Sequence, residues 1–178
     1  RTLWVSFLSS FALELLATLS VAVVAVTVGF RITSDGPLRD AKLLIWTTTP
    51  WTLPSNLAVM VGADIDYVVV EHDGHEGVQR LLLAEARLPA YARELGGDPV
   101  VTWRGVGADL VGLTYEPPFS YFAGHANAFR VVRADEFVTT TDGTGLVHSA
   151  GAFGEADKEV TDREGIEPVM PVAKDGRF

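Results

Sequence analysis

Short runs of hydrophobic residues, separated by turns that contain glycine and proline, follow one another along most of the chain. Runs of this length with many β-branched side chains are typical of strands. They predict strands at residues 41–46, 57–61, 67–71, 78–83, 100–105, 113–115, 129–133, 137–141, 146–148 and 168–172. A polar turn is predicted at residues 72–77, between the third and the fourth of these runs.

Two stretches show the spacing of a helix instead. In residues 84–95, apolar side chains fall on one face and a glycine pair ends the pattern (Leu88, Tyr91, Ala92, Leu95, Gly96, Gly97). Pro89 suits the first turn of a helix, so the regular helix is expected to begin near it. Residues 154–164 predict a second short helix, closed by Gly165. The pattern therefore predicts a strand-rich mixed α/β domain and not alternating βαβ units.

The first thirty residues differ from the rest, because Glu14 is their only ionisable side chain apart from Arg1. We interpret them as a buried helix over residues 3–19 that leads into a valine-rich core strand over residues 21–30. A membrane helix is the alternative, but it needs about 20 apolar residues, and polar side chains interrupt this run. A secretory signal needs a positively charged start, to which Arg1 alone contributes little. Solubility without detergent would separate these interpretations.

Composition narrows the class of protein. The chain has 178 residues, 48% of them hydrophobic, which suits one globular domain with a real core. Its net charge of −9 argues against tight binding of a polyanion by this chain alone. The absence of cysteine excludes disulfides and thiolate metal sites, and it is typical of a reducing compartment. Because the chain starts with arginine and not with methionine, we expect it to be a piece of a longer protein.

The segment WTTTPWTLPSN, residues 46–56, holds the first candidate residues. Each of its two prolines is expected to keep the preceding residue extended, which affects Thr49 and Leu53. Three threonine hydroxyls on a stiff extended segment would form a rigid set of hydrogen-bond donors and acceptors. The alternative is that Thr47, Thr48 and Thr49 are ordinary β-branched strand residues.

The segment GTGLVHSAGAFGEAD, residues 143–157, holds the second group. A glycine turn leads into a short strand that ends at His148, and a glycine-marked loop leads to Asp157 near the predicted helix start. The plainer interpretation of Asp157 is a helix cap, and that of His148 is a hydrogen-bonded core histidine. Ser149 is not expected to act with His148, since adjacent strand residues point to opposite faces and no G-x-S-x-G elbow is present.

Two other kinds of site are not supported by the sequence. GTGLVH does not match the dinucleotide-binding fingerprint, and no phosphate-binding G-x-x-x-x-G-K-[ST] loop is present. His72 and His75 lie on a polar turn without further ligands at metal spacing, which indicates a solvated loop and not a zinc site.

Together, WTTTPWTLPSN and DGTGLVHSAGAFGEAD resemble the editing domain that is inserted in isoleucyl-tRNA synthetases. The segment GADLVGLTYEPPF, residues 107–119, is similar to the part of that family which lies between the two motifs. The motifs are long, in the right order and similarly spaced, and the resemblance covers about residues 26–178. The valyl and leucyl relatives carry a Thr-Thr-Arg-Pro type of motif and lack a histidine at the position of His148, which favours the isoleucine family.

Three departures from the family's pattern are visible. Gly151 replaces a proline, which makes the loop more flexible. Ala156 replaces the first of two acids, whereas Asp157 keeps the second. An atypical apolar segment at residues 1–25 replaces a mostly polar connection. We therefore divide what is overall a single domain into this segment and an editing domain at residues 26–178.

The resemblance implies a β-barrel-like domain with a few short peripheral helices and a function in post-transfer editing. Such a domain hydrolyses the ester of valine misattached to isoleucine tRNA and excludes isoleucine by size. The resemblance implies that the catalytic residues are Thr47, Thr48, Thr49 and Asp157, and that the substrate-binding residues are Trp46, Asn56 and His148. Asp157 would bind the ammonium group of the substrate, His148 and Trp46 would shape the pocket, and Asn56 would hold the loop or the terminal adenosine.

The same resemblance implies two partners in the cytoplasm: a tRNA 3′ end that carries misattached valine, and the remainder of the synthetase. No cofactor or metal is expected in this domain, because ATP, magnesium and zinc would belong to the rest of a full-length synthetase. The alternatives are a redesigned or inactive scaffold of that domain, and a non-enzymatic barrel that binds a small hydrophobic ligand. Release of valine from mischarged tRNA would separate them.

Overall fold

The larger of two β-sheets is built on a long hairpin. The computed structural model describes residues 30–74, 77–174 and 176–177, and in them β4 (Asp66–Gly74) pairs antiparallel with β5 (Gly77–Ala84). β6 (Val100–Val106) lies on the other side of β4, and β2 (Lys42–Leu43) runs parallel to β5. β1 (Phe30–Ile32) and β7 (Tyr115–Glu116) complete the order β6-β4-β5-β2-β1-β7. Residues 67–70 and 81–84 are buried in this sheet, which accounts for their β-branched and leucine-rich sequence.

The smaller sheet holds one of the candidate residues. Its middle strand β3 (Ala58–Val61) is parallel to β8 (Arg130–Arg133) and antiparallel to β9 (Val147–Ser149). All four residues of β3 are buried, as expected for a strand covered on both faces. Val59 pairs with His148, so the register of this sheet fixes where that histidine lies.

A backbone bridge connects the smaller sheet to the threonine segment, which we define as residues 46–49. Trp46 lies parallel to Val147, and its N–H donates to the carbonyl of Leu146 at 2.9 Å. The N–H of His148 donates in turn to the carbonyl of Trp46 at 3.3 Å. The strand-rich mixed α/β class is confirmed, but the two sheets of the described residues do not close into a barrel.

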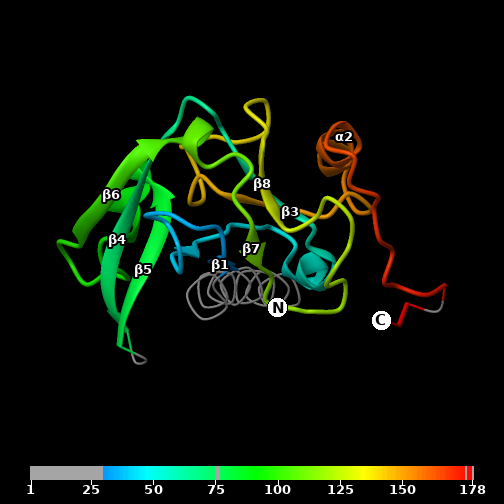
Figure 1. The fold of residues 1–178 in the computed structure, drawn as a ribbon, viewed down its shortest axis with the longest axis horizontal. Coiled ribbons are helices and arrows are strands. Elements are labelled where there is room, and N and C mark those ends of the chain that lie inside the picture. Colours follow the sequence, from blue (N-terminus) through cyan, green and yellow to red (C-terminus); the bar gives the residue numbers. More distant parts are fainter. Residues whose placement is uncertain (1–29, 75–76, 175, 178) are drawn as a thin grey trace, which may run out of the picture.

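The helices of the described residues are short. Three are 3₁₀ helices, η1 (Pro50–Ser55), η2 (Glu85–Tyr91) and η3 (Gly107–Asp109), and α2 (Glu155–Arg163) is an α-helix. In Figure 1, α2 lies at the opposite end of the molecule from β4, β5 and β6, with β3 and β8 between them. Within the described part of the chain, no helix is both long enough and apolar enough to cross a membrane.

The two predicted helices had different outcomes. α2 confirms the helix predicted at residues 154–164, and Gly165 ends it with a φ of 65°, in the left-handed region. The helix predicted at residues 84–95 is wrong in type, because the chain forms the 3₁₀ helix η2 and then turns. Pro89 lies inside η2 and has no N–H to give to an α-helical hydrogen bond.

The predicted strands at residues 137–141 and 168–172 are wrong, since neither range forms a strand. The apolar character of the first range reflects packing: Val138 is buried, and its N–H donates to the carbonyl of Ala134 at 3.1 Å in a turn. Pro168 and Pro171 remove donors from the second range. The other strands predicted after residue 40 are present, and their ends differ from the predicted ends by at most a few residues.

Two further predictions concern the ends of the hairpin and the start of the chain. The turn predicted at residues 72–77 is too long, because β4 extends to Gly74 and β5 begins at Gly77. The helix predicted at residues 3–19 lies outside the described residues. So does the strand predicted at residues 21–30, except for its last residue.

Gly151 is buried against α2, and this contact leads to the first prediction. A Cβ atom added at Gly151 would overlap the Oγ1 atom of Thr161, which is itself fully buried. Gly151→Ala should therefore lower the free energy of unfolding by about 1–3 kcal/mol through overpacking. The measurement is urea unfolding of the wild type and the variant.

Thr161→Ala provides the matched control, because it removes the atom that the new methyl group would strike. In the double variant, part of the loss should be recovered, with a coupling energy of about 0.5–3 kcal/mol. Additive losses in the double variant would show that the contact between these two residues does not limit packing.

Candidate functional site

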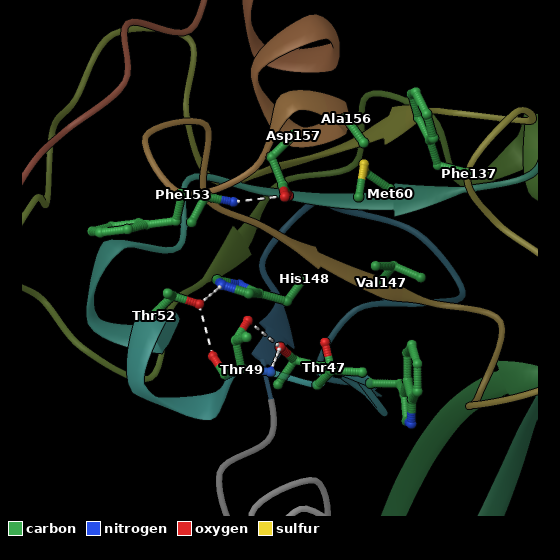
Figure 2. Close-up of a pocket in the computed structure, with 13 residues that line it drawn as sticks. Thr47, Thr49, Thr52, Met60, Phe137, Val147, His148, Phe153, Ala156 and Asp157 are labelled. Atoms are coloured by element: carbon green, nitrogen blue, oxygen red, sulfur yellow. Dashed lines mark hydrogen bonds between the residues drawn. The ribbon is translucent and has the colours of Figure 1, made fainter.

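A pocket lies between the threonine segment, β9 and the first turn of α2 (Figure 2). Its volume is about 250 Å³, just below the roughly 300–1,000 Å³ of sites that bury a drug-sized ligand. In Figure 2, Asp157 extends from α2 on one side of the view, Thr47 and Thr49 lie on the other, and His148 lies between them. The lining residues are Trp46, Thr47, Thr48, Thr49, Thr52, Met60, Phe137, Val147, His148, Ala150, Phe153, Ala156 and Asp157.

The pocket brings together most of the residues that the sequence had selected. Those that line it are Trp46, Thr47, Thr48, Thr49, His148 and Asp157. The exception among the candidates is Asn56, which is 2% exposed and lies behind the pocket wall. Two segments separated by about a hundred residues therefore form one cavity.

The threonine segment is a turn and not an extended segment as predicted. The N–H of Thr49 donates to the Thr47 hydroxyl at 3.1 Å, and η1 begins directly afterwards. Thr49 has φ −129° and ψ 69°, and Leu53 lies within η1, so neither has the expected extended conformation. Local hydrogen bonding by a threonine hydroxyl competes with strand pairing, which explains the difference. The hydroxyl of Thr48 is exposed and has no hydrogen bond within the described residues.

His148 is a buried neutral imidazole whose two nitrogen atoms both have partners. Its Nε2 lies 2.9 Å from the Thr52 hydroxyl, and its Nδ1 lies 2.8 Å from Nδ2 of Asn56. Burial lowers the pKa of His148 to about 4, so the ring is uncharged at neutral pH. Because both nitrogens are bonded to protein, the ring can present carbon atoms to a ligand but no free base.

Asn56 supports His148 and does not line the pocket. Its Nδ2 group also donates to the carbonyl of Ala58 at 2.8 Å, which is the backbone just after η1. The predicted role in holding the loop is compatible with this position. A contact between Asn56 and an adenosine stays a prediction, and the buried position of the side chain gives it no support.

Asp157 lies in the first turn of α2, where a carboxylate interacts favourably with the helix dipole. Its Oδ1 accepts the N–H of Ala150 at 3.1 Å. Burial raises the pKa of Asp157 above its ordinary value, while the hydrogen bond from the Ala150 N–H acts in the opposite direction. A Cβ added at Gly154 would lie 2.5 Å from its Oδ2, so the glycine of the AFGEAD sequence leaves room for the carboxylate.

Trp46 forms one end of the pocket and depends on a glycine. Gly143 has φ 62°, and an added Cβ would lie 2.7 Å from the Trp46 ring. Arg87 from η2 fixes the loop around Gly143, since its Nε donates to that carbonyl at 2.7 Å. The DGTG turn, predicted only as a connection into β9, therefore also supports a pocket residue.

Several lining residues were not among the candidates. Thr52 lies inside the quoted threonine motif and binds His148, and Phe153 lies inside the second motif. Ala150 also lies inside the second motif, whereas Met60 and Phe137 come from segments whose sequence indicates only a hydrophobic interior. Their position depends on which elements pack together, and a single sequence does not provide that information.

Ser149 is fully buried, does not line the pocket and has no hydrogen-bond partner for its hydroxyl in the described residues. No group of three or more histidine, aspartate or glutamate side chains suited to a metal ion occurs among the residues described.

A second pocket is larger, but its described lining residues are mostly apolar. It has a volume of about 430 Å³ and is lined by Pro54, Tyr121, Phe122 and Pro171. None of these four described residues carries a carboxylate or an imidazole. The first pocket is therefore better suited to bind a ligand with an amine, because Asp157 supplies a negative charge there.

The chain is closely similar to isoleucine–tRNA ligases. It is 57% identical to the enzyme of Mycobacterium tuberculosis over 157 residues, which cover 86% of this chain and 15% of that protein. It is 53% identical to the enzyme of Corynebacterium diphtheriae over 163 residues, which cover 85% of this chain and 15% of that protein. The chain thus spans about a seventh of the length of these relatives.

Solved structures show the same fold. The crystal structure of the P. knowlesi cytosolic leucyl-tRNA synthetase editing domain aligns with a TM-score of 0.54 and 13% identity, over 70% of this chain and 51% of that one. No protein-family model matches the chain. The identity to the curated relatives over most of its length is nevertheless decisive, and the chain belongs to the isoleucine–tRNA ligase family.

Proposed function

We propose that this chain is the post-transfer editing domain of an isoleucine–tRNA ligase, and that its pocket hydrolyses the ester of valine misattached to isoleucine tRNA. One observation carries the proposal: Asp157 and the threonine segment, far apart in the sequence, line the same small cavity. The fold shared with leucyl-tRNA synthetase editing domains supports it.

A second site is needed because valine and isoleucine differ by one methylene group. In a hydrophobic pocket this difference is worth about 1–3 kcal/mol, a limit for which isoleucine–tRNA ligases are themselves the established example. A cavity that admits valine and excludes isoleucine removes the errors that this limit allows. The small volume of the pocket, about 250 Å³, is compatible with such a test of size.

The proposed role of Asp157 is to bind the ammonium group of the substrate. Ionised, it would form a charge-assisted hydrogen bond with that group, and its bond to the Ala150 N–H holds it in place. It is the single carboxylate among the lining residues. The amine would thus fix the position of the ester relative to the threonine segment.

Hydrolysis would then rest on positioning. An aminoacyl ester is already reactive, so binding a water and the developing oxyanion is sufficient to accelerate its cleavage. The Thr48 hydroxyl, which has no hydrogen bond within the described residues, is available for this task, and the Thr47 and Thr49 hydroxyls lie 3.5 Å apart beside it. His148 is not the base in this scheme, because both of its nitrogens bind protein groups. A ribose hydroxyl of the substrate is our candidate for the proton acceptor.

His148 and its neighbours would form the wall that excludes isoleucine. The neutral His148 ring is hydrogen-bonded at both nitrogens, so moving it would break these bonds. Forcing one more methylene into a packed site costs about 1–3 kcal/mol. Val147 and Met60 add apolar surface to the same wall.

The partners of this site follow from its chemistry. We propose that the 3′ end of tRNA enters the pocket, and that the remainder of the synthetase binds the tRNA body, since this chain has a net charge of −9. ATP, magnesium and zinc would belong to that remainder, and the whole enzyme would act in the cytoplasm.

The test of this function is hydrolysis of two substrates, supplied separately: isoleucine tRNA that carries valine, and isoleucine tRNA that carries isoleucine. The isolated chain should act weakly, because it lacks the part that delivers the tRNA end. The decisive enzyme is the Mycobacterium tuberculosis ligase with its matching segment replaced by this chain. We expect release of valine and little release of isoleucine.

Isoleucylation by the same chimera is the control, because it depends on the rest of the enzyme and reports correct folding. A chimera that charges tRNA normally but releases neither amino acid would contradict the proposal. It would favour an inactive scaffold or a ligand-binding module instead.

Asp157→Asn tests the ammonium anchor with almost no change of shape. Loss of the charge should lower the hydrolysis of valyl-tRNA by about 10- to 100-fold, the effect of losing a hydrogen bond to a charged group. Asp162→Asn is the matched control on the same helix, since Asp162 is exposed and pairs with Lys158. Equal activity of the two variants would rule out the anchor role.

His148→Ala tests the size limit. Removal of the ring should allow cleavage of isoleucyl-tRNA, so the preference for the valyl ester should fall by about 10-fold or more. His125→Ala is the control, because His125 is outside the pocket and its Nε2 bonds only to the backbone carbonyl of Glu167. If the preference is unchanged in a folded His148→Ala enzyme, another residue sets the limit.

A further inference from the structure

A series of buried hydrogen bonds begins at Tyr115 and ends in the threonine segment. Tyr115 belongs to β7, within the GADLVGLTYEPPF motif for which the proposed function so far gives no role. Its ring is 3% exposed and packs edge-to-face against Phe30 and Phe129, with centroid distances of 5.4 and 6.3 Å. The hydroxyl group is therefore held in one place.

The first link joins Tyr115 to Asn56 and has a defined direction. Nδ2 of Asn56 donates to the carbonyl of Ala58, and a carbonyl can only accept. The amide oxygen therefore faces Tyr115, whose O–H donates to Oδ1 of Asn56 at 2.6 Å. Burial raises the pKa of Tyr115 well above its ordinary value, so this hydroxyl keeps its proton.

The second link fixes the tautomer of His148. One N–H of the Asn56 amide goes to the carbonyl of Ala58, and the other points to Nδ1 of His148 at 2.8 Å, with the carbonyl of Ser149 as a weaker third acceptor at 3.5 Å. Nδ1 must accept this hydrogen bond, so in the neutral ring the proton is on Nε2.

The third link reaches the threonine segment. The hydroxyl of Thr52 donates to the carbonyl of Thr49 at 2.8 Å, so its oxygen is free to accept from Nε2–H of His148 at 2.9 Å. The direction of donation along the series is thus the same throughout: Tyr115, Asn56, His148, Thr52, Thr49.

We propose that Tyr115 is a positioning residue of the editing site, whose hydroxyl orients the Asn56 amide and thereby holds His148 in the Nε2-protonated form. This inference rests on the proposed function for its effect on selectivity, but the tautomer itself can be measured without any activity. Tyr115 does not line the pocket and acts only through Asn56 and His148.

The proposal explains why a tyrosine in β7 matters for a pocket formed by other elements. Without its hydroxyl, the amide oxygen of Asn56 would be buried without a hydrogen-bond partner in the described residues, and only the N–H groups would hold the amide, through Ala58, His148 and Ser149. The ring of His148 would then be less well fixed, and the wall against a larger side chain would yield more easily.

The first measurement is the tautomer of His148 in the ¹⁵N-labelled wild-type chain at neutral pH, by long-range ¹H–¹⁵N correlation of the ring. The signals of His148 are those that disappear in His148→Ala. We expect protonated Nε2 and unprotonated Nδ1. The opposite tautomer, or a charged ring, would overturn the proposal.

Tyr115→Phe removes only the hydroxyl and keeps the ring contacts. It should shift the ring signals of His148 and lower the preference for the valyl over the isoleucyl ester by about 2- to 10-fold, the effect of one hydrogen bond. The rate on the valyl ester should change little, because Asp157 still binds the amine. These rates are measured in the chimeric ligase described above.

Tyr67→Phe is the matched control. Tyr67 is fully buried, and its hydroxyl donates to the carbonyl of Gly145 at 2.6 Å and accepts the N–H of Gly62 at 3.3 Å, so its loss also removes buried hydrogen bonding. It should leave the His148 tautomer and the ester preference unchanged. If Tyr115→Phe and Tyr67→Phe behave alike in both measurements, Tyr115 has only a structural role and the proposal is wrong.

Asn56→Asp provides a variant that does not depend on Tyr115→Phe being folded. A carboxylate can accept from Tyr115 but cannot donate to Nδ1, so the proton of His148 should move to Nδ1. An unchanged Nε2-protonated ring in this variant would contradict the proposed link. If the chimera hydrolyses neither ester, the proposed function fails, and the tautomer measurements still decide the role of Tyr115.

Discussion

The pocket depends on the pairing of a three-residue strand with backbone on both of its sides. β9 is antiparallel to β3, and Trp46 lies parallel to Val147 on its other edge. This arrangement brings the threonine segment next to His148 and, through the loop that follows, next to Asp157. Because side chains alternate along a strand, a slip of one residue would exchange His148 for Ser149 in the pocket wall. The long hairpin of β4 and β5 supplies most of the core, but the register of β9 decides which groups meet.

A second constraint is the hydrogen bonding of buried polar groups. His148, Asn56, Thr52 and Tyr115 are all at most 6% exposed, so an unpaired donor or acceptor among them would be costly. Their hydrogen bonds all donate in the direction from Tyr115 to Thr52. This makes the wall that contains His148 rigid and leaves His148 without a free nitrogen. Two other lining residues differ, since the Thr48 hydroxyl has no hydrogen bond within the described residues and Asp157 is only partly buried. A fixed wall combined with such polar groups is an arrangement suited to sorting ligands by size while binding their common polar part.

Several features could be predicted from the sequence because they are local. β4 and β5 follow their own hydrophobic runs, and α2 has its own spacing and a closing glycine. The candidates in the two motifs were found by resemblance, and the fold places most of them in one pocket. Errors occurred where tertiary packing determines the local conformation. Phe137 and Val138 are apolar because they pack in a core, and the threonine segment turns because the Thr47 hydroxyl binds the Thr49 N–H. The position of Asn56 behind His148 also depends on packing between distant elements.

The two departures from the family's motif near Asp157 are compatible with this structure. Gly151 lies so close to Thr161 that a larger residue would require α2 to move or Thr161 to shrink, so the glycine matches its surroundings and the loop is not simply loosened. Ala156 lines the pocket, and its methyl group leaves Asp157 as the single carboxylate there. A second acid at that position would place like charges together and disfavour ionisation of either one, which burial already makes harder for Asp157. With alanine there, the pocket keeps one negative charge for one amine, and the rest of its surface remains available to test the size of the side chain.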